Sequence, residues 1–358
     1  MTRYILRQLG VMIITALALT FVVFSLTNMQ PNLEKVAKFE GNARMTDEDV
    51  VSWLEKNGYD RPMVVRYGEW LGIAPGWTRT DEAGEETGRC IALDQPDRRF
   101  CGIIQGQWGH STVFKEDVGV IISKRLALTG KLMFWVMVVM VPGALIVGIL
   151  AGMREGSRLD RTLSTGSILT TATPEYVSGV IFVALLASSK YGLGPILSEW
   201  GWIEGRTLFK GTATAAMENA TLENFLLPVM TIALYGMGYI ARMTRASMTE
   251  VMTAQYIRTA RLKGVSFHKI VIKHALRNAL IAPFTVIMLQ IPWLLNGVVI
   301  VETLFNYKGF GWTLVQAAGS NDIELLQGIA IVSVVVVLFT QLISDIGYRF
   351  LNPRIRIS

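Results

Sequence analysis

"LMFWVMVVMVPGALIVGILAGM", residues 132–153, contains no charged residue and is rich in Val, Met, Leu and Ile. A helix of this length crosses a hydrocarbon layer of roughly 30 Å. Soluble domains usually have about a quarter of their residues charged, whereas this chain has 17% charged and 51% hydrophobic residues. The stretch therefore predicts a membrane-spanning helix.

Five further apolar runs resemble this one. The six predicted spans are 10–29, 132–153, 168–188, 225–241, 280–301 and 326–347. The first has Arg3 and Arg7 before it, as a signal peptide would, but the polar boundary "LTNMQPN" follows it in place of a small-residue cleavage site. An uncleaved signal anchor is therefore expected. The predicted fold class is an all-α integral membrane protein with six transmembrane helices.

The placement of Lys and Arg orients these spans. If the N-terminus is cytoplasmic, 16 of the 34 basic residues and only three acids lie in the inside segments 1–9, 154–167, 242–279 and 348–358. Short basic loops usually face the cytoplasm. Both termini are therefore expected there, and the net charge of +6 needs no nucleic-acid partner.

Four parts are expected along the chain. They are the N-terminus with the first span (1–30), an extracytoplasmic loop (31–131), a core of five spans (132–347) and a cytoplasmic tail (348–358). In the loop, Thr46 is expected to begin a helix that stops near Gly58, and a second short helix should follow Pro62. The next segment is rich in Gly, Asp and Pro, which predicts turns and a short hairpin.

The only two cysteines, Cys90 and Cys101, lie in this loop, which the predicted topology places on the oxidising side of the membrane. We expect a disulfide between them; the alternative is two free thiols. A zinc site is not expected, because two cysteines without a nearby cluster of histidines cannot supply four ligands.

Sequence motifs of catalysis are missing. The sequence contains no G-x-x-x-x-G-K-[ST], no H-E-x-x-H and no G-x-S-x-G, and its three histidines are scattered. We therefore expect no catalytic residues, no metal site and no cofactor in this chain.

Charges within the predicted spans are scarce, and Glu175 is the clearest of them. It follows Pro174, which would disturb the helix and free a backbone carbonyl. An intramembrane carboxylate can line a polar pathway, and Arg242 and Arg245 are conceivable partners. The alternative is a carboxylate at the cytoplasmic interface, or one paired with a neighbouring span.

The inside segment 255–278 reads "QYIRTARLKGVSFHKIVIKHALRN", with six basic residues and no acid. Met248, Val251, Met252, Tyr256 and Ala260, at helical spacing, predict one helix before Gly264, and Ser266 is the expected N-cap of another. Gly264 suits a left-handed turn between them. The apolar face of this pair is more than the short loop can cover by itself, so a partner groove or anionic lipid should cover it. The residues alone leave both open.

The same segment carries a family resemblance. "AQYIRTARLKGVSFHKIVIKHALRNALIAP", residues 254–283, resembles the EAA signature loop of bacterial ABC importer permeases of the dipeptide, oligopeptide and nickel group. Other segments that fit this family in order include "YDRPMVVRYGEWL", "GQWGHS", "ATPEYVSGVIF" and "VETLFNYKGFGWTLVQAA". The resemblance covers most of the chain.

The resemblance implies the type I ABC importer permease fold in a bacterial inner membrane. It implies three kinds of partner besides lipid: a second homologous permease subunit, two ATPase subunits that bind ATP and magnesium, and an extracytoplasmic solute-binding protein. It also implies that a helix within 252–273 couples the ATPases to the spans. The residues that match the coupling motif are Gln255, Tyr256, Arg258, Thr259, Ala260, Arg261, Gly264 and Phe267.

The sequence departs from the family pattern at three places. Thr259 stands where the Glu of the name-giving Glu-Ala-Ala does, the tail has Asn352 in place of Asp, and the Cys-bearing segment 73–105 is long. The Thr variant is common in the peptide group, so the resemblance still implies coupling. Peptides are the expected solute, with nickel chelates, opines or oligosaccharides as alternatives. A stand-alone secondary carrier is disfavoured, since it would need more intramembrane charges.

Overall fold

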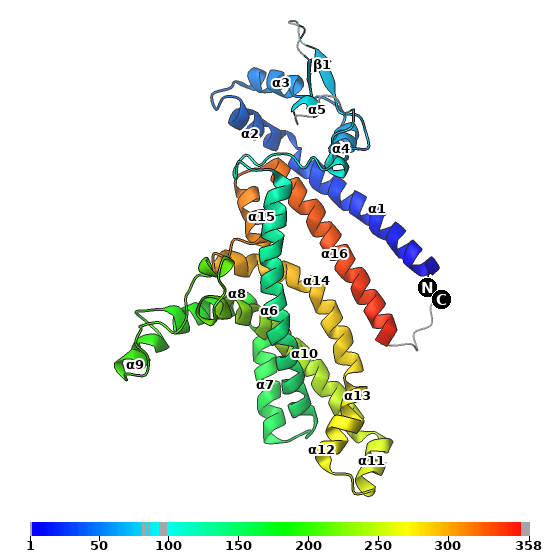
Figure 1. The fold of residues 1–358 in the computed structure, drawn as a ribbon, viewed down its shortest axis with the longest axis vertical. Helices are drawn as coiled ribbons and strands as arrows, with labels where there is room; N and C mark the ends of the chain where they lie inside the picture. Colours follow the sequence, from blue (N-terminus) through cyan, green and yellow to red (C-terminus); the bar gives the residue numbers. More distant parts are fainter. Residues whose placement is uncertain (1, 81–83, 85, 93–98, 352–358) are drawn as a thin grey trace. The chain divides into compact units, whose positions relative to one another are not determined.

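The computed structural model describes residues 2–80, 84, 86–92 and 99–351, which are mostly helical (Figure 1). The tail substitution at Asn352 lies outside the described residues. The chain folds as two compact units, one of Met1–Leu126 with Thr313–Leu338 and the other of Ala127–Trp312 with Phe339–Ser358. Each unit therefore combines segments that are distant in the sequence.

Several helices of the described chain are long and apolar enough to cross a membrane. There are four of them: α1 (Thr2–Thr27), α6 (Val118–Gly152), α10 (Leu222–Thr253) and α16 (Ile323–Leu351). Two bent pairs of helices raise the number to six if each pair is one span. These helices indicate a multi-pass membrane protein. The number of six transmembrane spans stays a prediction.

The first bent pair replaces the continuous span expected over 168–188. Helix α7 (Arg158–Ala172) ends before Thr173, and α8 (Glu175–Phe182) continues through the π-helix η2 (Val183–Ala187). The two helices differ in direction by 102°. The cause is Pro174, which lacks an N–H group and disfavours a helical conformation in the residue before it.

The second bent pair, Phe267–Ala279 with Ile281–Leu294, contains the second half of the basic segment. Helix α10 runs to Thr253, well past the expected end of the fourth span at 241. The elements that follow are α11 (Gln255–Leu262), α12 (Phe267–Lys269), the π-helix η4 (Ile270–Ala275), α13 (Leu276–Ala279) and α14 (Ile281–Leu304). The chain bends by 50° where α14 begins, and α11 to α13 gather at one end of α10 and α14 (Figure 1).

The first unit contains the short helices and the hairpin expected in the outside loop. Its elements include α2 (Gln30–Glu40), α3 (Asp47–Lys56), α4 (Met63–Leu71), the antiparallel strands β1 (Thr78–Thr80) and β2 (Glu86–Gly88), α5 (Arg89–Ala92) and η1 (Ile103–Gln105). The predicted cap is confirmed: Thr46 and Asp49 accept each other's backbone N–H at the start of α3. Aromatic packing of Phe24, Tyr67 and Trp70 joins α1 to α4.

The second unit has the larger apolar core, in which α6, α10 and α14 pack together. Its fully buried side chains include Leu132, Met140, Ile232, Ile240 and Leu294. The remaining elements of the chain are α9 (Leu193–Glu199), η3 (Ala215–Met217) and α15 (Phe310–Gly319). This core supports the ends of α10 and α14, where the basic segment lies.

Candidate functional site

The basic segment forms a helix–turn–helix, as its sequence predicts. The first helix is not continuous as predicted, because Ala254 is extended and separates α10, which carries Met248 and Met252, from α11. Gly264 has φ +74°, in the left-handed region, and its N–H donates to Arg261 O at 3.0 Å. Ser266 occupies the N-cap position of α12, although its side chain makes no capping hydrogen bond. The left-handed turn explains the glycine, since an L side chain is strained there.

The apolar face of this helix–turn–helix is covered by the chain itself. Ile257, Ile270, Val271 and Ala275 are buried in one cluster with Met248 of α10. The prediction that a partner groove or anionic lipid should cover this face is therefore wrong for these four residues, because Met248 and Met252 of α10 pack on them. The physical reason is that α10 continues beyond the apolar run and supplies its last two turns as a packing surface.

A smaller apolar patch remains exposed around the turn, and we call Tyr256, Leu262 and Phe267 the turn patch. Their exposed fractions are 42%, 83% and 37%. Single exposed apolar residues are ordinary, but three around one glycine turn form a candidate contact surface. Sequence reasoning missed Leu262. A signal was available in the sequence: Leu262 does not share the helix face of Ile257 and Ala260, so it should point away from the buried side of α11.

Several contacts hold the residues around the turn in place. Ala260 is buried, and the Thr259 hydroxyl donates to Gln255 O at 3.1 Å along α11. Asn278 of α13 donates to the Tyr256 hydroxyl at 2.9 Å. The Arg154 guanidinium lies 5.1 Å from the centre of the Phe267 ring. Arg258 and Arg261 are exposed on α11, so positive charge lies beside the turn patch.

Glu175 lies at the first position of α8 and is half-buried. Its Oε1 is 3.0 Å from the point that a Cβ on Gly297 of α14 would occupy, so the side chain reaches α14. Neither expected arginine pairs with it among the described residues. Arg242 lies over the Tyr239 ring, 5.9 Å from its centre, and Arg245 pairs with Asp160.

The Asp160–Arg245 ion pair was not anticipated from the sequence. Arg245 Nε and Nη2 lie 2.5 and 2.8 Å from the two carboxylate oxygens, and Asp160 also accepts from Gly156 N–H and the Ser164 hydroxyl. The Asp160 side chain is 3% exposed. A buried carboxylate needs such a full set of donors, so this pair fixes the start of α7 against α10.

A second buried acid, Glu302, also escaped the sequence analysis. It is fully buried near the end of α14, accepts from the Thr129 hydroxyl and accepts from Trp312 N–H at 2.9 Å. Thr129 in turn accepts from Phe310 N–H at 2.8 Å. The position of Glu302 directly after the apolar run 280–301 was the signal available. Both carboxylate oxygens are hydrogen-bonded, so Glu302 ties the turn after α14 to α6.

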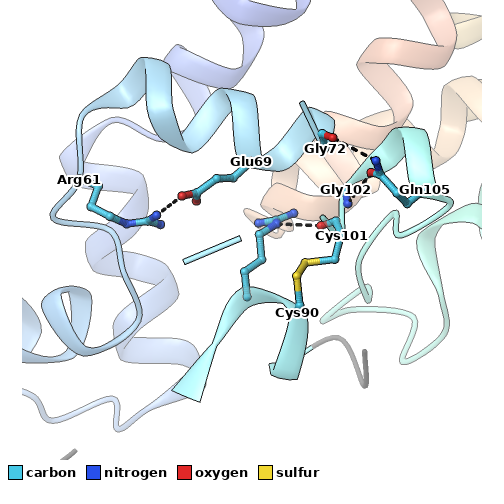
Figure 2. The surroundings of a disulfide bond; sticks show 8 residues. Arg61, Glu69, Gly72, Cys90, Cys101, Gly102 and Gln105 are labelled. Atoms are coloured by element: carbon cyan, nitrogen blue, oxygen red, sulfur yellow. Dashed lines mark hydrogen bonds and ion pairs between the residues drawn. A yellow bond between two sulfur atoms is a disulfide. The ribbon is translucent and has the colours of Figure 1, made fainter. Parts of the chain in front are cut away.

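Cys90 and Cys101 form the disulfide that the sequence predicts, with Cα atoms 5.4 Å apart (Figure 2). Both cysteines are buried. Arg89 Nε donates to Cys101 O at 3.3 Å, and Gln105 bridges Gly72 O and Gly102 N–H, at 3.0 Å each. The disulfide thus anchors the segment after β2 next to the end of α4. No group of His, Cys, Asp and Glu residues within the described chain could hold a metal ion.

Comparison with known proteins gives a family match over most of the second unit. The family described as "Binding-protein-dependent transport system inner membrane component" matches residues 144–357. This range contains the turn patch, Glu175 and the Asp160–Arg245 pair.

Curated relatives extend the similarity to the rest of the chain. The dipeptide transport system permease protein DppB of Haemophilus influenzae is 33% identical over 71% of this chain and 78% of its own. The di/tripeptide permease DppB of Pseudomonas aeruginosa is 29% identical and the dipeptide permease DppB of Escherichia coli K12 is 28% identical, each over 99% of both chains. A crystal structure of an amino acid ABC transporter with histidines matches 65% of this chain at 16% identity with a TM-score of 0.45, and that likeness carries no argument.

Proposed function

The chain belongs to the family of binding-protein-dependent transport system inner membrane components, and on that premise we propose that it is a permease subunit of an ATP-driven importer of short peptides. The choice of a peptide as solute is supported by relatives that are named as dipeptide or di/tripeptide permeases and align with nearly the whole chain. A second homologous permease would complete the pathway, and a solute-binding protein would deliver the peptide. Two ATPase subunits would bind ATP and magnesium, so this chain needs no cofactor of its own.

The observation that carries the proposal is the turn patch beside Gly264. Exposed apolar side chains with arginines next to them suit a groove in a protein partner that has an apolar floor and an acidic rim. The rest of the segment is packed on α10 through Ile257 and Ile270. Because packed interiors transmit displacement, a partner that moves the turn would move α10 with it.

Removal of one side chain of the turn patch tests this role. Leu262→Ala should weaken binding of the ATPase subunits to the chain in lipid nanodiscs by roughly tenfold, because a buried Leu contributes about 1.5–3 kcal/mol. The matched control is Leu222→Ala, at the other end of α10, where the Leu is also strongly exposed. Equal affinity for Leu262→Ala and the unaltered chain would count against a docking role for the turn.

The solute has its own test. The solute-binding protein that acts with this permease should carry a short peptide when it is purified from its host. If it carried a nickel chelate, an opine or an oligosaccharide, the peptide would be the wrong solute. The assignment of the chain as an importer subunit would be unaffected. Uptake that needs no ATPase would favour a secondary carrier.

A further inference from the structure

The first unit contains a cavity of about 610 Å³ in its extracytoplasmic-loop part. The cavity lies between α2, the loop 110–115 and the junction of α15 with α16. Its lining residues are Lys35, Val36, Phe39, Glu40, Tyr59, His110, Thr112, Lys115 and 318–324. Pockets for small molecules usually measure about 300–1,000 Å³, so the cavity has the size of a ligand site.

Two acids of the lining are already bonded within the wall. Asp322 accepts from the Ser111 hydroxyl at 2.6 Å and from Val113 N–H at 3.2 Å. Glu324 accepts from His110 N–H at 2.6 Å. These bonds hold the loop 110–115 against the start of α16, so the wall is formed before any ligand binds.

Three other charged residues of the lining, Lys35, Glu40 and Lys115, make no ion pair among the described residues. The Lys115 ammonium lies 5.8 Å from the centre of the Phe39 ring. Desolvation, and then the nearby Asp322, raise the pKa of Glu40, while Lys115 lowers it. Because neither side chain has an ion-pair partner among the described residues, a cationic group placed at Glu40 and an anionic group placed at Lys115 would each gain one.

The backbone of this wall is unusual. Lys115 (φ +54°) and Asn321 (φ +55°) are two of the three non-glycine residues with positive φ in the described chain. This conformation costs free energy and is held by its surroundings, here by hydrogen bonds from Lys115 N–H to Ser111 O (3.0 Å) and from Asn321 Nδ2 to Asn32 O (3.3 Å). Such strain concentrates at ligand-binding sites.

We propose that this cavity binds a short zwitterionic peptide, with Glu40 facing its ammonium group and Lys115 facing its carboxylate. Phe39, Val36 and Tyr59 provide apolar surface for the peptide side chains. The inference rests on the proposed function, in which the outside loop faces the side where solute is delivered. It adds a peptide site on the permease itself, separate from the turn patch.

The test measures equilibrium binding of radiolabelled L-alanyl-L-phenylalanine to the full-length chain in lipid nanodiscs. Glu40→Gln and Lys115→Gln should each weaken binding by about tenfold or more, because each removes a charged partner of one peptide terminus. The matched controls are Glu48→Gln and Lys56→Gln, exposed residues of α3 that do not line the cavity. N-acetyl-L-alanyl-L-phenylalanine amide, which lacks both charges, should compete at least about tenfold more weakly.

The outcomes separate this site from the proposed function. Saturable binding that is weakened by both cavity variants and by capping supports the site, even if the assembled transporter imports no peptide. Absent binding by the unaltered chain, or equal binding by the cavity variants and the controls, overturns the site. If the assembled transporter still imported peptide in that case, the proposed cavity site would be wrong and the proposed importer function would remain.

Discussion

Gly264 is the residue whose backbone conformation most limits substitution in the coupling turn. Nothing lies within 4 Å of the point where a Cβ would be, so space is not the constraint. The constraint is φ +74°, which costs an ordinary L residue roughly 1–2 kcal/mol and a β-branched residue more. The glycine therefore preserves the path of the turn rather than its packing.

Gly264→Val should consequently change the turn and uncouple ATP hydrolysis from uptake. We expect peptide uptake by the reconstituted transporter to fall by roughly tenfold, while the chain still inserts and keeps its packed core. Gly264→Asn is the control, because Asn tolerates this region of φ. Full uptake and full peptide-stimulated ATP hydrolysis in Gly264→Val would contradict the coupling role.

Individual residues also show how far the sequence could predict the site. The left-handed turn at Gly264 and the Cys90–Cys101 disulfide could be predicted from local sequence. A glycine at the end of a helix commonly forms such a turn, and a pair of cysteines in a predicted outside loop commonly forms a disulfide. The Asp160–Arg245 and Thr129–Glu302 contacts join residues 85 and 173 positions apart. Such pairs depend on how the helices pack, which periodicity in one segment does not contain.

At the scale of elements, the disulfide loop is the part of the first unit most dependent on one covalent bond. Its strands β1 and β2 have three residues each, and a hairpin of that size is marginal without support. Closing a loop with a sequence separation of 11 contributes about 3 kcal/mol in the chain-entropy account.

Replacement of both cysteines should therefore loosen this loop and spare the spans. In Cys90→Ser/Cys101→Ser, we expect faster tryptic cleavage within 73–105 and unchanged insertion in the membrane. Thiol labelling of the unfolded, non-reduced protein gives the direct measurement: the disulfide predicts no labelled cysteine before reduction and two after it. Two labelled thiols before reduction would rule the bond out.

The helices were predicted more accurately in position than in shape. Apolar runs located α6, α10 and α16, since hydrocarbon length sets a minimum for each. Hydropathy carries no information about direction, so the 102° bend between α7 and α8 appears in the sequence only as Pro174. The extension of α10 to Thr253 was missed for a related reason: a helix that leaves the lipid keeps its hydrogen bonds while its side chains turn polar.

At the scale of the whole molecule, orientation in the membrane stays a prediction. It rests on the basic inside segments, and it places the turn patch with the ATPases and the disulfide on the oxidising side. We expect a fluorescent protein fused after residue 358 to be fluorescent in intact cells. Alkaline phosphatase fused after residue 210, between α9 and η3, should be active. Phosphatase activity at the C-terminus would reverse the topology and separate the turn patch from any cytoplasmic partner.

The continuity of α10 from the apolar core to the coupling turn has a mechanical consequence. Its 32 residues make a rod about 48 Å long at 1.5 Å per residue. For a rod of that length, a tilt of only ~6° about one end displaces the other by ~5 Å, close to one helical turn. On the proposed function, a small tilt of α10 with its pivot at the Gly264 turn would therefore shift its far end by about one helical turn, a distance that would open or close a passage there.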